Sequence, residues 1–268
     1  MPDRFEACIA RWGLARDGEA IATHSSDLLP VRRGEVPAML KLAREAQERR
    51  GGLLMRWWAG EGAARVLAHA DGALLLERAL GRRSLIEMAH HGRDDEATGI
   101  ICAVAAKLHA PRGPLPRGLV PLARWFRELE PAAARHGGIL AKAAAAAREL
   151  LATPRDIGVL HGDLHHDNVL DFEERGWLAI DPKGLLGERG FDFANIFRNP
   201  DLATAASPER LARQAGIVAG AAGLERRRLM QWILAFAGLS AAWIIGDGDT
   251  PSLDLAVAEL AAAELARC

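Results

Sequence analysis

Hydrophobic and polar positions in the first 80 residues alternate in short runs that are separated by turn residues. The runs with strand character are residues 19–23, 28–32, 36–42, 66–68 and 73–78. Residues 43–57, rich in Ala, Arg, Glu, Gln and Leu, predict a helix, although Gly51-Gly52 weakens its middle. The pattern predicts a small α+β unit of five strands and one helix.

After residue 80 the spacing of apolar positions becomes helical. Ser84 is a predicted helix N-cap, and Glu87 completes a capping box three residues later. A long helix is predicted over residues 94–109, ended by the segment PRGPLP, and residues 122–151 predict one or two more. A short strand, WLAIDP, precedes the helices that continue to the C-terminus.

The chain length limits how these elements are arranged. With 268 residues, 50% of them hydrophobic and 26% charged, the chain is long for one core and short for two independent domains. We therefore expect one bilobal α+β protein. Its N-terminal antiparallel sheet lobe with one main helix covers residues 1–80, and its mostly helical lobe covers residues 81–268.

The charge balance narrows the class of partner. A formal net charge of −1 argues against a nucleic-acid binder, whose affinity comes mainly from Lys and Arg. Residues 1–160 nevertheless carry a net +5 and residues 161–268 a net −6. A cationic lobe suits phosphates and an acidic lobe suits a cationic substrate. Chance scatter over solvated surfaces is the alternative.

Cysteine use and hydropathy predict the compartment. Cys8, Cys102 and Cys268 are far apart and form no CxxC pair, which suits a reducing cytosol. The N-terminal residues MPDRFEACIARWG are charged, without an apolar signal core, and no stretch approaches eighteen uninterrupted apolar residues. We expect a cytoplasmic protein, a monomer or weak dimer, that binds no membrane.

One segment, LHGDLHHDNVL, concentrates polar side chains. Asp163 can accept a proton from a substrate hydroxyl. Asn168, five residues on, and Asp181, at the end of the strand WLAI, offer hard oxygen ligands suited to Mg²⁺. The connection FEERG predicts a hairpin that brings these two ligands together. A base and two oxygen ligands form the catalytic half of a phosphoryl-transfer site.

The other half requires a cation that holds nucleotide phosphates. Lys41, in the third predicted strand, is the only lysine before Lys107. A helical acid should pair with it, and either Glu48 or Glu45 of the following helix can do so. A solvated edge charge is the alternative interpretation of Lys41.

These motifs resemble the protein-kinase-like fold. Protein kinases carry HRD with an asparagine five residues after the aspartate, and HGD with Asn168 keeps that spacing. The segments THSSDL, RWWAGEGAARVL, LLLERA, HGDLHHDN, RGWLAIDPKGLLGERGFDFAN and GLSAAW resemble, in order, the streptomycin 6-phosphotransferase and hydroxyurea phosphotransferase family. The resemblance covers most of the chain.

The resemblance implies ATP and Mg²⁺ and a role for each matching residue. Asp163 would be the catalytic base, with Asn168 and Asp181 on Mg²⁺. Lys41 would contact the α- and β-phosphates, with Glu48 as its partner.

The same resemblance implies supporting residues around this centre. The backbone of a hinge from Glu77 to Ala79 would meet adenine, and Asp192, in GFDFAN, would brace the catalytic loop. The phosphate loop HSSDLL has no glycine, so Ser25 and Ser26 would supply its backbone or hydroxyl contacts.

The remaining polar residues divide between packing and acceptor binding. His161 is expected to pack against neighbouring backbone. Of His165 and His166, one would line the acceptor pocket and the other would be buried and hydrogen-bonded. Asp247 and Asp249 are candidates for gripping a cationic acceptor, or part of a solvated rim.

We therefore expect an ATP-dependent phosphotransferase that acts on a hydroxyl of a small molecule. An aminoglycoside of the streptomycin type is the first candidate for the acceptor, and another hydroxylated metabolite or hydroxyurea is the second. A metallohydrolase that uses HxDxHHD as metal ligands is a remote alternative, because it leaves Lys41 and Asn168 unexplained. A non-catalytic nucleotide-binding module is a third class, but it would lose one of these residues.

Overall fold

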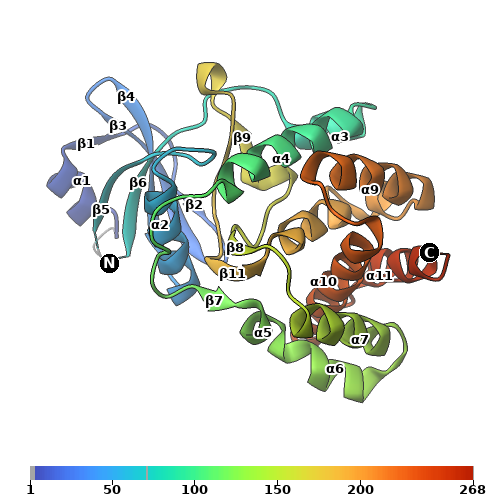
Figure 1. Ribbon diagram of the computed structural model, residues 1–268. Helices are drawn as coiled ribbons and strands as arrows, with labels where there is room; N and C mark the ends of the chain where they lie inside the picture. Colours follow the sequence, from blue (N-terminus) through green and yellow to red (C-terminus); the bar gives the residue numbers. More distant parts are fainter. Residues whose placement is uncertain (1–3, 71, 268) are drawn as a thin grey trace.

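The computed structural model describes residues 4–70 and 72–267. An antiparallel sheet with two helices forms the N-terminal part, and a mostly helical region follows it (Figure 1). This is the two-part α+β architecture that the hydropathy pattern predicts.

The N-terminal sheet contains six strands within these described residues, with the order β1-β3-β4-β6-β5 and β2 paired to β3. Its elements are α1 (Glu6–Trp12), β1 (Leu14–Arg16), β2 (Ile21–Ala22), β3 (Ser26–Arg33), β4 (Val36–Ala43), α2 (Ala46–Trp58), β5 (Val66–Ala70) and β6 (Ala73–Glu77). The sequence pattern missed α1 and β1. Both are short, and α1 buries only part of one face against the sheet, so neither gives a clear period.

The two faces of this sheet have different roles. Alternation along β4 places Leu40 in a small core beneath α1, together with Val31 and Leu75. The next residue, Lys41, therefore points to the opposite face, where α2 and the C-terminal region lie. Strand periodicity thus directs the lysine into the space between the two parts of the protein.

Helix α2 belongs to the larger, C-terminal core. Its buried Trp58 donates a hydrogen bond from Nε1 to the carbonyl oxygen of Leu108 (3.1 Å), and its ring stacks on His161 at 6.1 Å. Gly51 permits a close approach, since a Cβ at this position would lie 2.2 Å from the carbonyl oxygen of Pro182. The glycine pair that weakens the helix pattern is therefore required by packing.

The C-terminal helices begin where the sequence predicts. Ser84 caps α3 (Leu85–His90) by accepting a hydrogen bond from the backbone N–H of Glu87. The predicted helix over 94–109 is α4 (Asp94–His109), and residues 122–151 form three α-helices rather than one or two. The later helices are α5 (Leu122–Trp125), α6 (Leu129–His136), α7 (Gly138–Ala152), α8 (Leu202–Ala205), α9 (Pro208–Ala222), α10 (Arg226–Gly246) and α11 (Ser252–Leu265).

Short strands lie between these helices and carry the polar segment. They are β7 (Val120–Pro121), β8 (Ile157–Leu160), β9 (Val169–Asp171), β10 (Trp177–Ala179) and β11 (Leu185–Glu188). Strands β9 and β10 pair as the hairpin predicted around FEERG, and β7, β11 and β8 form a three-stranded sheet.

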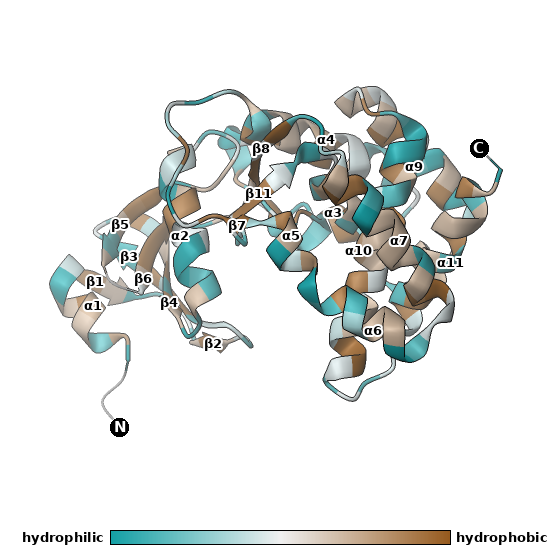
Figure 2. Cartoon of the chain, turned by 60° about the horizontal axis from the view of Figure 1, so that its bottom comes forward, coloured by the Kyte–Doolittle hydropathy of each residue, from teal (hydrophilic) through white to brown (hydrophobic). Residues whose placement is uncertain are grey.

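Helix α10 is the centre of the helical region, packed against α7 and α11 (Figure 2). In the described part of the chain it alone is long and apolar enough to cross a membrane, but 78% of its most apolar stretch is buried inside the protein. Gly238 of α10 meets Ala143 of α7, where a Cβ would lie 2.2 Å away. The alanine-rich α7 thus lets two helices approach closely, and α10 is a core helix.

The connection between the two parts is fixed to the β9–β10 hairpin. Arg83 makes two hydrogen bonds to Asp171, at 2.7 and 2.8 Å, and this arginine lowers the pKa of the Asp171 carboxyl to about 2. Gly81 lies so close to Asp171 that a Cβ would overlap its side chain. The connection therefore lies close against the C-terminal region.

Candidate active site

The segment after β8, residues 161–168, is termed the catalytic loop here. It ends at Asn168, and a backbone hydrogen bond of 2.9 Å from Ile180 N–H to the Asn168 carbonyl oxygen joins it to the end of β10. This bond places Asn168 and Asp181 side by side, as the predicted hairpin requires.

Asp163 lies in the middle of this loop and keeps both carboxylate oxygens hydrogen-bonded. Its Oδ1 accepts from Asn195 Nδ2 at 2.8 Å, and its Oδ2 accepts from Asn168 Nδ2 at 3.3 Å. The Lys183 ammonium lies 3.3 Å from Oδ2. Amide donors on both oxygens fix the orientation of the carboxylate.

His161 and Asp192 shape the loop from within the protein. His161 is fully buried, donates from Nε2 to the Ile180 carbonyl oxygen (2.8 Å) and accepts from the Asp163 N–H at Nδ1 (3.2 Å). Burial lowers the pKa of this histidine, so the ring is neutral. Asp192 accepts backbone N–H groups of His161 (2.8 Å) and Gly162 (2.7 Å). Both residues therefore support the loop.

Lys41 reaches two carboxylates beneath the sheet. It forms ion pairs with Glu48 of α2 and with Asp181. Glu45, the alternative partner in the sequence, lies instead 3.6 Å from His24. The structure therefore pairs Lys41 with Glu48.

Asp181 is held as a charged carboxylate in a strained position. Burial favours its neutral form, but Lys41 and Lys183 outweigh burial and lower the pKa to about 2. Its φ of +63° is a left-handed backbone conformation that costs about 1–2 kcal/mol for a side chain other than glycine. Such strain is concentrated at functional sites, where the surrounding structure enforces it.

Sequence reasoning missed two residues of this centre, Asn195 and, with more contacts to charged groups, Lys183. Its ammonium lies 3.3 Å from Asp163, 3.6 Å from Asp181 and 3.9 Å from Glu48. Burial opposes its charge, but these carboxylates raise the pKa above the ordinary lysine value. Its place two residues after Asp181 was the available signal, but only the fold shows that it also reaches Asp163.

An inner cavity of about 370 Å³ lies between the sheet and the β9–β10 hairpin. Its lining is mostly apolar and includes Leu28, Met39, Leu74, Leu76, Leu170, Phe172 and Ile180. The charged groups Lys41, Glu48 and Asp181 and residues 77–79 also line it. Apolar walls with a few polar groups are typical of a cofactor site. Glu77 and Ala79, the predicted hinge residues, therefore border this cavity.

The predicted phosphate loop is a turn between β2 and β3. Ser25 lines the inner cavity and donates its hydroxyl to Glu48 at 2.9 Å. Ser26 is buried, and its backbone N–H donates to the hydroxyl of Thr23 at 3.0 Å. The N–H of Ser26 is therefore hydrogen-bonded within the turn.

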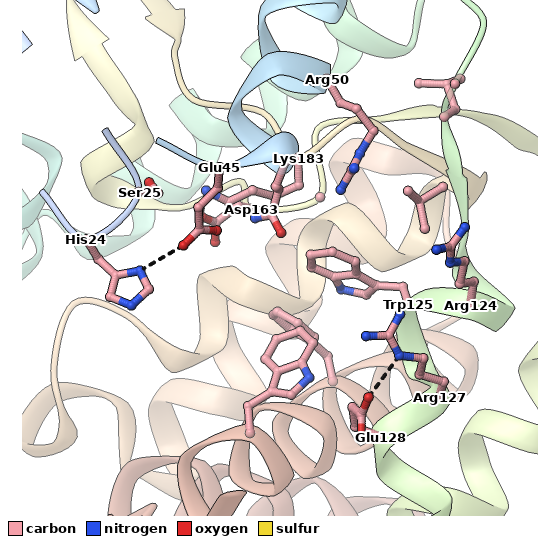
Figure 3. A pocket seen from close by; sticks show the side chains of 17 residues that line it. His24, Ser25, Glu45, Arg50, Arg124, Trp125, Arg127, Glu128, Asp163 and Lys183 are labelled. Atoms are coloured by element: carbon pink, nitrogen blue, oxygen red, sulfur yellow. Dashed lines mark hydrogen bonds and ion pairs between the residues drawn. The ribbon is translucent and has the colours of Figure 1, made fainter. Parts of the chain in front are cut away.

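An outer pocket of about 710 Å³ opens beside Asp163 and Lys183 (Figure 3). The aromatic residues Trp125 and Trp243 form part of its wall, with their rings edge-to-face at 5.3 Å. Its carboxylates are Asp163, Glu45 and Glu128, and its basic side chains are His24, Arg50, Arg124, Arg127 and Lys183. Glu128 is paired with Arg127 at 2.8 Å, and Glu45 lies 3.6 Å from His24. The pocket thus combines aromatic surface with charged groups of both signs next to the catalytic loop.

The two other histidines of the loop do not line this pocket. His165 accepts from the N–H of Asp167 and contacts Asn168 at 3.1 Å, and burial lowers its pKa. His166 is buried 4.0 Å from Asp94, and neither ring nitrogen has a hydrogen-bond partner within the described chain. Of the two, His165 makes the expected hydrogen bond with a side chain that is 16% exposed, and His166 is buried without one.

The acids after α10 also lie elsewhere. Asp247 and Asp249 are exposed beyond the end of α10 and do not line the outer pocket. Asp254 is buried and bonded to Arg198 at 2.6 Å. Arg198 in turn donates to Asn195 at 2.9 Å, and Asn195 holds Asp163. This acid therefore supports the catalytic loop through two intermediates.

The directions of the three loop histidines oppose the metallohydrolase alternative. Their rings contact Ile180, Asn168 and the neighbourhood of Asp94, which lie in different parts of the protein. Within residues 4–70 and 72–267, no group of three or more His, Cys, Asp or Glu side chains is arranged to hold a metal. The oxygen donors of Asn168 and Asp181 are instead a pair that suits Mg²⁺ bound together with phosphates.

A lysine–glutamate pair beneath an antiparallel sheet, a loop aspartate with an asparagine five residues on, and a second aspartate at a hairpin end together define a kinase of the protein-kinase-like fold. The chain belongs to the aminoglycoside/hydroxyurea antibiotic resistance kinase family, whose model matches residues 11–248. Its activity is phosphotransfer to an alcohol group.

Known proteins agree on family and fold. The chain is 56% identical over 260 residues to streptomycin 3''-kinase of Klebsiella pneumoniae, covering 94% of this chain and 97% of that protein. It is 34% identical to streptomycin 6-kinase of Streptomyces griseus, covering 98% and 88%. The crystal structure of aminoglycoside phosphotransferase APH(4)-Ia shares the fold, with a TM-score of 0.64 at 15% identity, over 96% of each chain.

Proposed function

We propose that the protein transfers the γ-phosphate of ATP to the 3''-hydroxyl of streptomycin in the cytoplasm, as an antibiotic resistance kinase. The carrying observation is the outer pocket, which opens beside Asp163 and combines the aromatic side chains of Trp125 and Trp243 with charged groups of both signs. Its 710 Å³ lies within the range of about 300–1,000 Å³ that is typical of drug-sized ligands. The higher identity to a 3''-kinase than to a 6-kinase supports the choice of hydroxyl.

The two parts of the chain divide the work in this proposal. Residues 1–80 form the nucleotide-binding lobe, and residues 81–268 form the catalytic and acceptor-binding lobe. ATP occupies the inner cavity, with adenine at the backbone of Glu77 to Ala79 and phosphates near Lys41. Asn168 and Asp181 would hold Mg²⁺, which would supply positive charge to the phosphates. The monomer contains both cavities, so no partner chain is needed.

The chain's own groups then prepare the acceptor. Asp163, fixed by Asn195 and Asn168, accepts the proton of the acceptor hydroxyl. The oxygen forms a bond to the γ-phosphorus as the bond between that phosphorus and the bridging oxygen of ADP breaks. The electron pair of the broken bond stays on ADP, and the proton resides on Asp163 until it leaves to solvent.

Acceptor recognition rests on charge and aromatic surface. Streptomycin carries guanidinium groups, and a cation over an aromatic face is favourable, most of all for tryptophan. Trp125 and Trp243 offer such faces, and Glu45 and Glu128 offer charge-assisted hydrogen bonds. These two glutamates take the role that the sequence suggested for Asp247 and Asp249.

The test is to incubate the purified protein with ATP, Mg²⁺ and a panel that contains streptomycin, other aminoglycosides, hydroxyurea and small alcohols. We expect one added phosphate on streptomycin by mass spectrometry, and phosphorus–proton NMR correlation should place it on the 3''-oxygen. Phosphate on the 6-oxygen would overturn the choice of hydroxyl. Phosphorylation of hydroxyurea or an alcohol in preference to streptomycin would overturn the acceptor.

A further inference from the structure

Lys183 occupies the boundary between the two cavities. It lines the outer pocket beside Asp163, whereas Asp181, its other near neighbour, lines the inner cavity. Figure 3 shows Lys183 next to Asp163 at the wall of the outer pocket. In an in-line transfer, the phosphoryl group moves from the nucleotide in the inner cavity to the acceptor in the outer pocket. It therefore passes between Asp181 and Asp163. The lysine ammonium lies at this crossing point.

Its position is fixed by backbone rather than left to a flexible side chain. The N–H of Lys183 donates to the His161 carbonyl oxygen at 2.7 Å. Gly162, with a φ of +85°, lies so close that a Cβ would be 3.2 Å from the Cβ of Lys183 and 2.7 Å from Leu185. A glycine at 162 is therefore required to bring residue 183 against the catalytic loop.

The formal charges indicate that Lys183 does more than neutralise the neighbouring carboxylates. Asp163, Asp181 and Glu48 carry three negative charges, and Lys41 with Lys183 supplies two positive ones. Asp181 would take a divalent cation as its counter-charge in place of Lys183, which now lies 3.6 Å away. The ammonium, with three donors, then remains available to a new anionic group beside Asp163.

We propose that Lys183 is a catalytic residue that binds the oxygens of the transferring phosphoryl group and stabilises their charge in the transition state. This inference rests on the phosphotransfer of the proposed function but not on the identity of the acceptor. A preorganised cation that acts on charge developing in the transition state contributes most when it is shielded from water. The Lys183 side chain is 14% exposed, so it meets this condition.

The test compares Lys183→Met and Lys183→Gln, which both remove the charge, with Lys142→Met, which changes an exposed lysine on α7. We expect both Lys183 variants to lose at least about 10²-fold in kcat, as for the loss of one oxyanion donor, and to change KM for ATP by less than about threefold. Lys142→Met should match the wild type.

A binding measurement separates this role from a structural one. Calorimetric titration with ADP·Mg²⁺, alone and with aluminium fluoride as a planar phosphoryl mimic, needs no acceptor turnover. The wild type should bind ADP more tightly with the fluoride, and each Lys183 variant should lose this gain while its affinity for ADP alone is unchanged.

Retention of the gain, or an equal loss of affinity for ADP alone, would overturn the assignment. The wild type could fail to phosphorylate streptomycin and still bind ADP more tightly with aluminium fluoride in a way that depends on Lys183. That result would reject streptomycin as the acceptor and would support the role of Lys183.

Discussion

Asp163 has amide donors on both sides, so its loss should affect chemistry more than structure. Asp163→Asn keeps the shape of the side chain and retains one oxygen to accept from Asn195. We expect turnover to fall by at least about 10²-fold, the usual loss for a positioned acid or base. Single-turnover kinetics measure the effect, with ADP affinity as the control. Near-normal turnover would remove Asp163 from the role of base.

The burial of His166 predicts how the stability of the protein depends on pH. Burial has the largest effect on the pKa of this ring and the positive charge of Arg210 the next largest, and together they lower it to about 4. The ordinary value of 6.5 applies in the unfolded chain, so unfolding takes up a proton between pH 6.5 and 4. The contribution of His166 to the free energy of unfolding is therefore fully present above pH 6.5, and it is lost as the pH falls from 6.5 to 4. The loss at pH 5 should reach about 2 kcal/mol.

His166→Leu removes the titration and two ring nitrogens without partners in the described residues. Urea unfolding at pH 7 and pH 5 should show a smaller decrease for this variant than for the wild type, by about 2 kcal/mol. His136→Gln changes an exposed histidine of α6 and should leave the decrease as in the wild type. An equal decrease in the His166 variant would contradict the burial argument.

At the scale of the element, α2 contains a glycine that lowers its helix propensity but is required by its packing. Gly51→Ala would gain helix propensity, but the new Cβ meets the Pro182 carbonyl oxygen at 2.2 Å. We expect stability to fall by about 1–3 kcal/mol from overpacking. Nucleotide affinity should also fall, because α2 carries Glu48. Gly216→Ala in α9 meets open space and should instead stabilise by about 0.5–1 kcal/mol.

Urea unfolding and titration with a non-hydrolysable ATP analogue measure both variants. If Gly51→Ala proves as stable as Gly216→Ala, and binds nucleotide equally well, the contact with Pro182 does not position α2.

The elements that sequence predicts best are those with local signals. Helix α4 has the predicted bounds because a clear apolar period precedes a proline-rich stop, and Ser84 caps α3 through a bond three residues away. Helix α1 was missed because none of its seven residues is buried. Lys183 was missed because its contact with Asp163 spans twenty residues and depends on how β11 pairs with β8.

At the scale of the whole molecule, the charge difference between the two halves does not by itself locate a binding site. Part of the negative charge of residues 161–268 is buried in ion pairs, as for Asp254. Besides Asp163, the acids that line the outer pocket are Glu45 and Glu128, one from each part of the chain. Only the fold shows which carboxylates reach the acceptor.

Glu45→Gln and Glu128→Gln should therefore weaken streptomycin binding. Loss of a hydrogen bond between charged groups costs about 1.5–3 kcal/mol, so the apparent affinity should fall at least about tenfold at both low and high salt. The Asp247→Asn, Asp249→Asn double variant should show only a small loss that disappears as salt screens it. Titrations at two salt concentrations measure this, and unchanged affinity in both glutamate variants would favour an uncharged acceptor.

Helix α2 is attached to the catalytic region at both its middle and its end, through Gly51 on Pro182 and through Trp58 on Leu108 and His161. Protein kinases control their activity by moving the helix that carries the glutamate partner of the lysine. Here such a movement would open the hydrophobic core. A switch that displaces α2 would therefore cost core packing, and this sets the enzyme apart from kinases that are regulated by moving this helix.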